Sequence, residues 1–280
     1  MSVEDLDAVM MNGMSTEPVT ADSRQSRQLA RQRAITEAVM AEGTVRIEQL
    51  ADRFDISLMT VHRDLDELEN RGLLRKSRGI ATATSTSLVE SSDVYRASRQ
   101  LAEKEAIALA ALEFVEPGQA IFLDDSTTVL HLAQHLPAKA PLTVITNVLT
   151  LMNELRGERG IDLLALGGQY YNWCSAFMGR MTVEAVSALR ADVFLMSTSA
   201  ITDDVAFHQT LETVDTKRAM FDAAERRILL ADHTKFDKRA LHALLPLKDF
   251  DAVVVDGATP HEHVGRLRDQ GIHVVVAEPA

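Results

Sequence analysis

The chain has 280 residues, 46% of them hydrophobic, which is enough for one large domain or two ordinary domains with sizeable cores. Its apolar runs are shorter than the roughly 18–20 residues that a membrane span requires, and its first residues lack the basic start and apolar segment of a secretory signal. The single cysteine, Cys174, excludes an internal disulfide and a cysteine-based zinc cluster. We therefore expect a cytoplasmic protein that holds no metal and no cofactor.

The net charge of −12 is divided unevenly along the chain. Residues 1–23 contain five acidic residues and no Lys or Arg, residues 24–80 contain eleven basic and nine acidic residues, and residues 81–280 contain eighteen and twenty-seven. Only the middle segment is positive. Because a phosphate backbone repels a negative surface, any contact with DNA is expected to be confined to about the first eighty residues.

Residues 1–23 mix acidic residues, Ser, Thr and Met without periodicity, and we predict that they form a disordered tail. The helix expected next ends at Gly43 and has Leu29, Ile35 and Val39 as core candidates. The arginines of this helix suit phosphate contacts or a solvated surface equally well.

Two short helices joined by a tight turn are predicted between Thr44 and Leu74. The first, 47–54, repeats apolar residues at helical spacing, and Ser57 after the turn is placed to cap the second. The second helix has an apolar stripe formed by Leu58, Val61, Leu65 and Leu68. Its other face presents Ser57, Met59, Thr60, His62 and Arg63. Small polar residues with one Arg and one His suit a helix that enters the major groove, although an ordinary helical hairpin has the same pattern.

A β-hairpin wing is predicted after this second helix. Gly72 permits a turn into a first short strand, and a second strand begins at Ile80. Three cations on the wing are positioned to reach the DNA backbone or minor groove: Arg75, Lys76 and Arg78. Residues 24–81 are therefore predicted to form a winged helix-turn-helix domain, and the Ser-, Thr- and Ala-rich residues 82–97 a linker.

From residue 98 to 280, strand and helix signals alternate. Short apolar runs predict strands at 120–123, 142–146, 161–166, 193–196, 228–231, 252–255 and 273–276. Helices are predicted at 101–114, 129–136, 149–155, 183–189, 214–224 and 262–268. This alternation is typical of an α/β domain with a mostly parallel sheet covered by helices on both faces.

Ligands of open α/β sheets bind beyond the carboxyl ends of the strands. The polar residues placed there form the candidate site, together with one lysine on the helix over residues 214–224: Asp124, Asp125, Ser126, Thr127, Thr128, Thr146, Asn147, Gly167, Gly168, Lys217, Asp232 and Lys235. Hydroxyls, backbone N–H groups and lysines suit a phosphate, and carboxylates or Asn suit sugar hydroxyls. For each Ser or Thr, capping of a helix is an equally good interpretation.

The N-terminal stretch resembles the DNA-binding module of the DeoR family of bacterial transcriptional regulators. The matching residues run from Ile47 to Phe54, through Thr60-Val61-His62-Arg63-Asp64-Leu65, to Gly72 and Arg75. The C-terminal part is similar to the effector domain of the same family, whose fold is like that of ribose-5-phosphate isomerase. The matches there are Glu103-Lys104, Leu123-Asp124, Thr127-Thr128, residues 142–147, Gly167-Gly168, Lys217-Arg218, Asp232 and Lys235.

This resemblance implies a non-enzymatic, DNA-binding regulator, a repressor of carbohydrate or polyol genes. It implies a homo-oligomer, dimer or tetramer, and a phosphorylated sugar-type effector whose phosphate lies on the loop that begins at Asp124. The chain departs from the family where His62 replaces the usual Arg, Asp125 replaces a Ser and Ser126 replaces a Gly. Three interpretations of Asp125 stay open: it points away, it binds a sugar hydroxyl, or it marks a less charged effector.

The residues also allow alternative interpretations. An isomerase acting on sugar phosphates could use Asp124, Asp125 or Asp232 as its base, but it has no use for a helix-turn-helix. Trp173 suits stacking on a sugar or a contact between subunits equally well. His263, near the start of a helix, is better explained as a solvent-exposed residue than as a metal ligand, and Cys174 is better explained as a packed, unreactive thiol.

Overall fold

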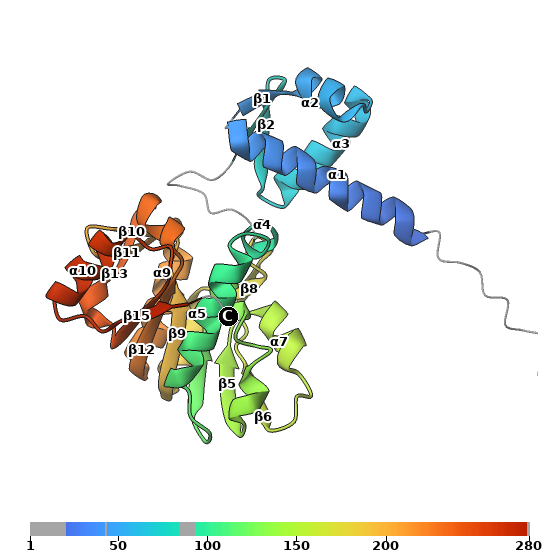
Figure 1. Cartoon of the computed structure of the whole chain (residues 1–280). Helices are drawn as coiled ribbons and strands as arrows, with labels where there is room; N and C mark the ends of the chain where they lie inside the picture. Colours follow the sequence, from blue (N-terminus) through green and yellow to red (C-terminus); the bar gives the residue numbers. More distant parts are fainter. Residues whose placement is uncertain (1–20, 43, 84–92, 279–280) are drawn as a thin grey trace, which may run out of the picture.

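The structure is a computed structural model that describes residues 21–42, 44–83 and 93–278. The first two ranges form a small N-terminal domain and the third forms a larger α/β domain (Figure 1). The predicted tail lies outside the described residues up to residue 20, whereas residues 21–23 belong to the first helix. Of the predicted linker, residues 82–83 end a strand, residues 93–97 form a helix, and residues 84–92 lie outside the described residues.

The N-terminal domain has three helices and a three-stranded antiparallel sheet of order β1-β3-β2. These elements are α1 (Ala21–Glu42), β1 (Thr44–Arg46), α2 (Ile47–Phe54), α3 (Leu58–Asn70), β2 (Leu74–Ser77) and β3 (Ile80–Ala83). The first helix of the predicted pair has the predicted bounds, and β2 with β3 forms the predicted wing. Asp55 in the left-handed region (φ 50°) ends α2 and turns the chain into α3.

The core of this domain contains Ile35, Val39 and the predicted stripe of α3 from Val61 onward. Two expected core residues are instead at the surface: Leu29 is 48% exposed and Leu58 is 47% exposed. Leu29 lines an open pocket together with Leu68 and Leu73 and is not enclosed in the core. Leu58 lies in the first turn of α3, beside the exposed Met59.

A buried ion pair joins α1 to α3. Arg31 Nε donates to Asp64 Oδ2 at 2.5 Å, and Gln32 Nε2 donates to Asp64 Oδ1 at 3.2 Å. The Asp64 side chain is 0% exposed, whereas Arg31 keeps 24%. Arg31 therefore has a structural role, because it fixes α1 on α3.

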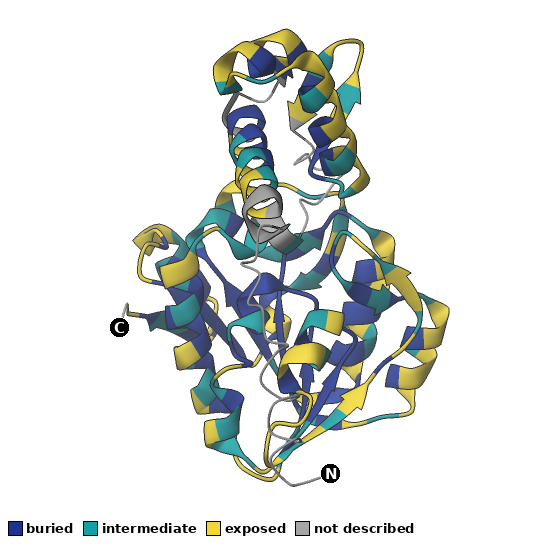
Figure 2. Ribbon diagram, turned by 90° about the vertical axis from the view of Figure 1, so that its right-hand side faces the viewer, coloured by how far each residue is buried: buried dark blue, intermediate teal, exposed yellow. Residues whose placement is uncertain are grey.

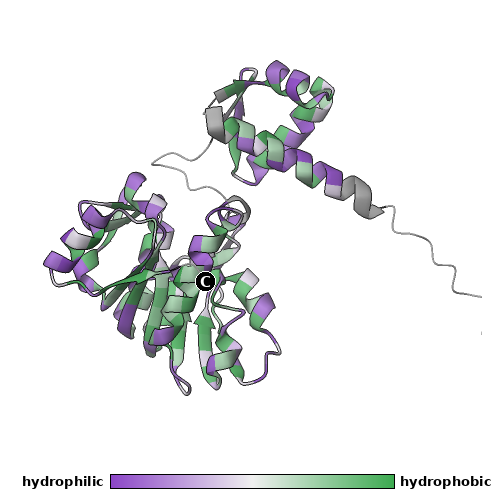
Figure 3. Cartoon of the chain, in the orientation of Figure 1, coloured by the Kyte–Doolittle hydropathy of each residue, from purple (hydrophilic) through white to green (hydrophobic). Residues whose placement is uncertain are grey.

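The C-terminal domain is built on seven parallel strands in the order β15-β14-β12-β9-β4-β5-β6. Their bounds are Ala120–Leu123 (β4), Leu142–Thr146 (β5), Ile161–Ala165 (β6), Ala191–Ser197 (β9), Ala224–Ala231 (β12), Ala252–Asp256 (β14) and Val274–Ala277 (β15). The central strands are continuous apolar runs because both of their faces are covered (Figure 3).

Alternate residues of each strand enter two separate cores, one on each face of the sheet. Ile121 and Leu123 pack with α5 and α7, whereas Phe122 and Phe194 pack with α8, α9 and α10. The strands of the sheet are largely buried, and the exposed residues lie mostly on the helices and loops around them (Figure 2). The helices are α4 (Asp93–Ala97), α5 (Leu101–Ala111), α6 (Thr127–Leu130), α7 (Leu149–Leu155), α8 (Arg180–Ser187), α9 (Leu211–Asp222) and α10 (His261–Asp269). Among the residues that the structure describes, no helix has the length and apolar character to cross a membrane.

The strand predicted at 161–166 is confirmed as β6, at the edge of the sheet. Elsewhere the fold differs from the sequence prediction. The helix predicted at 129–136 is a single turn, α6, that ends at Leu130, and the 3-10 helix Leu136–Lys139, with Pro137 near its start, follows after a turn. Strand β1 was not predicted. Two small antiparallel sheets were not predicted: β7 (Gln169–Tyr171) with β8 (Ala176–Met178), and β10 (Ala200–Thr202), β11 (Val205–His208) and β13 (His242–Pro246).

We expect Asp64→Ala to lower the free energy of unfolding of the N-terminal domain by about 2–3 kcal/mol, because it removes a fully buried partner of Arg31 and Gln32. Asp66→Ala on the same helix is the control, since Asp66 is 56% exposed and its loss should cost less than about 1 kcal/mol. Urea unfolding followed by circular dichroism measures both. Equal losses in the two variants would contradict the structural role of Asp64.

Candidate functional site

The N-terminal end of α3 presents an open face. Ser57 caps the helix, and its Oγ accepts the backbone N–H of Thr60 at 3.2 Å. Met59 is 78% exposed, and His62 and Arg63 are also exposed. The residues predicted to read DNA thus lie together on an uncovered surface, in line with an N-cap that orients the first turn outward.

The wing places its cations differently. Arg75 and Arg78 are exposed, and Arg78 at φ 50° forms the hairpin turn with Gly79. Lys76 instead forms an ion pair with Asp66, and its backbone N–H donates to a glutamate of α3 at 2.8 Å. Lys76 therefore helps to fix the wing on α3, and two of the three predicted wing cations are left at the surface.

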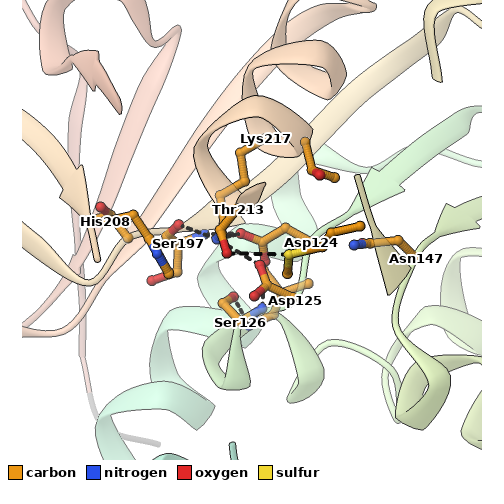
Figure 4. Close-up of polar contacts among 12 residues, drawn as sticks. Asp124, Asp125, Ser126, Asn147, Ser197, His208, Thr213 and Lys217 are labelled. Carbon is orange, nitrogen blue, oxygen red and sulfur yellow. Dashed lines mark hydrogen bonds and ion pairs between the residues drawn. The ribbon is translucent and has the colours of Figure 1, made fainter. Parts of the chain in front are cut away.

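The strand order brings the predicted ligand residues to one edge. Strands β12, β9, β4 and β5 are consecutive neighbours, so the residues that follow them meet at the carboxyl end of the sheet (Figure 4). Of the twelve residues predicted to form the ligand site, Gly167 is exposed and Gly168 is half-buried. The other ten are buried: Asp124, Asp125, Ser126, Thr127, Thr128, Thr146, Asn147, Lys217, Asp232 and Lys235.

Lys217 of α9 lies at the centre of this edge. Its Nζ donates to Asp124 Oδ2 at 2.6 Å and to the carbonyl of Ser197 at 2.9 Å, and it is 3.1 Å from Asp125 Oδ1. Asp124 Oδ2 also accepts the backbone N–H of Ser197 at 2.8 Å. One lysine and one carboxylate thereby hold together the ends of β4, β9 and α9.

The charges of this group support one another. Burial would raise the pKa of Asp125, but the charge of Lys217, with those of His208 and Arg96, holds it below its ordinary value. Burial would lower the pKa of Lys217, but Asp124 and Asp125 hold it above its ordinary value. Asp125 and Lys217 therefore both stay charged near neutral pH.

The hydroxyls at the edge have structural partners as well as ligand-binding capacity. Ser126 Oγ accepts the N–H of Val129 at 3.2 Å and so caps α6, and Thr146 Oγ1 donates to the carbonyl of Leu123 at 2.9 Å. The capping interpretation therefore holds for Ser126. Asn147 donates through Nδ2 to the carbonyl of Phe177, while its buried Oδ1 has no hydrogen-bond partner among the residues that the structure describes. An amide oxygen of this kind can accept a ligand hydroxyl.

The two glycines after β6 are used for close packing. Thr182 Oγ1 donates to the carbonyl of Gly167 at 2.8 Å. A Cβ at Gly168 would lie 2.1 Å from Thr182 Oγ1 and 2.8 Å from the carbonyl oxygen of Met178. A side chain at Gly168 would therefore push α8 and β8 away from the edge of the sheet.

A second cationic group lies at the end of β12. Lys104 of α5 is 3% exposed, and its Nζ donates to the carbonyl of Arg96. Burial, and then the charge of Lys235, lower the pKa of Lys104 to about 7. Lys235 Nζ is 3.9 Å from Asp232 Oδ2. Lys104 and Lys235 are both buried, and Asp232 is the carboxylate beside them. An anionic ligand would suit this place, because it would reduce the repulsion between the two lysines.

Sequence reasoning did not place Lys104 in the site. The sequence does contain a signal for it. Lys104 lies on the same helix face as the apolar residues Ile107, Ala108 and Ala111, and a lysine on a buried face needs a buried polar partner. His208 at the end of β11, which affects the pKa of Asp125, had no such signal because β11 itself was not predicted.

Trp173 packs beside the site. Its ring centroid is 6.3 Å from that of His208, and the Arg96 guanidinium carbon lies 6.0 Å from it. Its carbonyl accepts the backbone N–H of Asp93 at 2.9 Å. Next to it, burial raises the pKa of the Cys174 thiol, which is consistent with inert packing. Among the described residues, no group of three His, Cys, Asp or Glu side chains is arranged to hold a metal ion.

Solved structures with similar parts were found. Ribose 5-phosphate isomerase from Plasmodium falciparum matches 49% of this chain and 53% of its own, with 14% identity and a TM-score of 0.36. The translation initiation factor eIF-2B from Pyrococcus horikoshii OT3 matches 90% of this chain and 95% of its own, with 14% identity and a TM-score of 0.42. The architecture rests on the strand order described above and not on these two structures.

Sequence relatives are closer. The transcriptional repressor AccR of Agrobacterium fabrum is 31% identical over 82% of this chain and 90% of its own. The lactose phosphotransferase system repressor of Staphylococcus epidermidis is 32% identical over 79% and 89%, and the HTH-type regulator YgbI of Escherichia coli is 30% identical over 89% and 97%. Family models match as well: the DeoR-like helix-turn-helix domain at residues 31–87 and the DeoR C-terminal sensor domain at residues 99–257. This chain belongs to the DeoR family of transcriptional regulators.

Proposed function

We propose that this protein is a cytoplasmic transcriptional repressor of carbohydrate or polyol genes, which binds operator DNA and responds to a phosphorylated sugar or polyol. One observation carries the proposal: the same chain has an uncovered recognition surface on α3 and a buried cationic group at the strand ends of its sensor domain. The repressor names of relatives, including one for a lactose phosphotransferase system, support it.

The DNA contacts are assigned to the N-terminal domain. Arg63 and Thr60 reach bases or phosphates, Ser57 supplies a phosphate contact, and His62 adjusts base preference. Arg75 and Arg78 of the wing add contacts to the DNA backbone. The acidic C-terminal region stays away from the phosphates, since its 27 acidic and 18 basic residues repel them.

A single helix-turn-helix makes few contacts, so we propose that the chain works as a homo-oligomer that presents two recognition helices to two half-sites. The effector would then act by changing the relative placement of these helices, which shifts the balance between DNA-bound and free protein.

In the sensor domain we assign the anionic end of the effector to Lys104 and Lys235. Both are buried, and the low pKa of Lys104 shows that its charge lacks full compensation. Hydroxyls of the effector would meet Asp125, Ser126 and the free Oδ1 of Asn147. An isomerase is disfavoured because its base needs a pKa close to neutral, whereas the pKa of Asp125 and that of Asp232 are lowered.

We propose that α4 transmits the presence of the effector to the DNA-binding domain. Asp93, the first residue of α4, directly follows residues 84–92, which connect the domains, and it is hydrogen-bonded to Trp173. Arg96 of α4 lies over the Trp173 ring and accepts a hydrogen bond from Lys104 through its carbonyl. A Cβ at Gly72, just after α3, would lie 3.8 Å from Trp173 Cβ. An effector that moves Lys104 therefore moves α4 and Trp173.

Arg63→Ala should weaken operator binding in a gel shift by about 5- to 150-fold, because a bidentate Arg contact is worth about 1–3 kcal/mol. Arg180→Ala, a change at an arginine of α8 whose side chain is 89% exposed, is the matched control and should leave retention intact. Both variants should show the same ligand-induced thermal shift as the wild type. Unchanged retention by the Arg63 variant would remove this residue from the DNA interface.

Lys104→Met should abolish the thermal shift produced by the best ligand of a panel of phosphorylated sugars and polyols. In the wild type, affinity should fall as the pH rises from 7 to 9, because Lys104 has a pKa of about 7 and loses its positive charge over that range. The phosphate has a second pKa of about 6 and only gains negative charge over this range, so a fall in affinity reports the protein. The same loss of affinity with pH in the Met variant would show that another group is responsible.

Trp173→Ala should uncouple the two domains. The wild type is expected to change its operator affinity about 5- to 150-fold with that ligand, and the variant less than threefold, while each retains DNA and ligand binding. Tyr170→Ala, in the same β7–β8 region and 41% exposed, is the control. Fluorescence anisotropy of a labelled operator with and without ligand measures the ratio. A full response in the Trp173 variant would contradict the proposed route.

A further inference from the structure

Strand β6 is an open edge of the main sheet. It pairs with β5 on one side, and no strand among the residues that the structure describes pairs with its other side (Figure 1). Lysine, proline and β-bulges commonly protect such an edge from pairing with another chain. The strand, Ile161–Ala165, has none of these, and its one charged residue is Asp162. Leu164 is 40% exposed on this edge.

The backbone groups of β6 that point outward follow from the hydrogen bonds at its two ends. The carbonyl of Gly160 accepts a backbone N–H of β5 at 3.0 Å, and the N–H of Leu166 donates to a carbonyl of β5 at 2.9 Å. Along a strand, the N–H and C=O groups of successive residues point to alternate sides. The even-numbered residues therefore bond to β5, and the groups of Ile161, Leu163 and Ala165 point away from the sheet.

These outward groups match a second copy of the same strand. In an antiparallel pair, residues that lie directly opposite each other can exchange both of their backbone hydrogen bonds. With a twofold axis at Leu163, its two copies would exchange such bonds, and the N–H of Ala165 would donate to the carbonyl of the partner's Ile161. The N–H of Ile161 is not needed, because it already donates to the carbonyl of Glu158 at 3.2 Å. The edge is therefore self-complementary in this register.

The side chains agree with this register. Ile161 and Leu163 are half-buried against the core on the α5 and α7 face of the sheet, and Ala165 points to the same face. Pairing across the axis would enclose these apolar residues between the two copies. On the other face, Asp162 would lie opposite the partner's Leu164. The two Asp162 carboxylates would then be diagonal neighbours, about 7–8 Å apart, and would not face each other directly.

The neighbouring charges do not oppose this pairing. The turn before β6 carries three exposed charged residues, namely Arg156, Glu158 and Arg159. They lie beyond the paired positions, and their net positive charge offsets that of Asp162. Glu154 of α7 interacts with the charge of His131, which belongs to its own copy.

We propose that β6 forms a homodimer interface, in which two copies pair their β6 strands antiparallel about a twofold axis at Leu163 and join their sheets into one. The inference rests on the proposed function, which calls for a homo-oligomer and leaves its surface open. The axis relates the two sensor domains and so sets the spacing of the two recognition helices. An extended peptide of another protein can also add to a sheet edge, but it would leave the purified protein monomeric.

The test is the mass of the full-length protein in sedimentation equilibrium. Ala165→Pro removes an N–H that β5 does not use, so the sheet should stay folded while the pairing is weakened. Leu164→Asp places a carboxylate opposite the partner's Asp162 at both symmetric positions. Like charges directly opposite are destabilising, so each variant should weaken the wild-type dimer by about fivefold or more. A wild type that assembles further should be halved in mass by either change.

A rescue variant tests the register. Adding Asp162→Lys to Leu164→Asp places an ammonium opposite each introduced carboxylate, so the double variant should recover dimerisation to within about threefold of the wild type. Leu241→Asp, at a leucine that is 56% exposed and outside β6, is the matched control and should keep the wild-type mass. Thermal unfolding checks that each variant is folded.

The outcomes separate this interface from the proposed function. A monomeric wild type would overturn the inference, and so would Ala165→Pro and Leu164→Asp variants that keep the wild-type mass. Equal weakening in Leu241→Asp, or no rescue in the double variant, would also overturn the proposed pairing. Operator retention in a gel shift would leave the proposed function standing in each of these cases. A dimeric wild type that is dissociated by the β6 changes but does not retain operator DNA would instead contradict the proposed function and support the interface.

Discussion

The buried ion pair between Lys217 and Asp124 is the contact on which the sensor site depends. It joins α9 to the ends of β4 and β9, and the same carboxylate accepts the N–H of Ser197. Removing Lys217 would leave the buried carboxylates of Asp124 and Asp125 without this cation, at a cost of about 3–5 kcal/mol. The position of the loop after β4, and therefore of Asp125, follows from this pair. A comparable pair, Arg31 with Asp64, fixes the first helix of the N-terminal domain on the recognition helix.

The division of charge between the domains gives each its own partner. The excess of acidic residues in the C-terminal region disfavours contact with DNA there, which agrees with the proposed DNA contacts of the small N-terminal domain. Within the sensor domain the net negative charge is not uniform, because Lys104 and Lys235 create a local cationic end beneath the surface. An acidic protein can therefore attract an anionic ligand at this end. The buried lysines act strongly at short range, whereas solvent and salt screen the acidic residues on the surface.

Much of the fold and the edge that carries the candidate site could be predicted from the sequence, because both depend on local patterns. The bounds of β4, β5, α2 and α7 follow directly from apolar runs, helical spacing and turn residues. The rest depends on contacts between distant residues. Lys104 meets Lys235 only after the sheet has formed, and β11 pairs with β13 across more than thirty residues. Neither contact leaves a periodic signal, and Leu58 shows that an apolar stripe can extend beyond the core it predicts.

A comparison of free energies favours Lys104 over Lys217 as the lysine that binds the proposed effector. A ligand with a dissociation constant of 1 μM has about 8 kcal/mol of binding free energy in total. Freeing Lys217 from Asp124, Asp125 and Ser197 would consume about 3–5 kcal/mol of it. Lys104 requires no such rupture, because burial and Lys235 already hold its pKa at about 7. In the proposed site, a phosphate beside Lys104 would favour the charged form of this lysine. The sequence places Lys217, and not Lys104, in the candidate site, whereas this free-energy comparison favours a structural role for Lys217 and supports the proposed recognition role of Lys104.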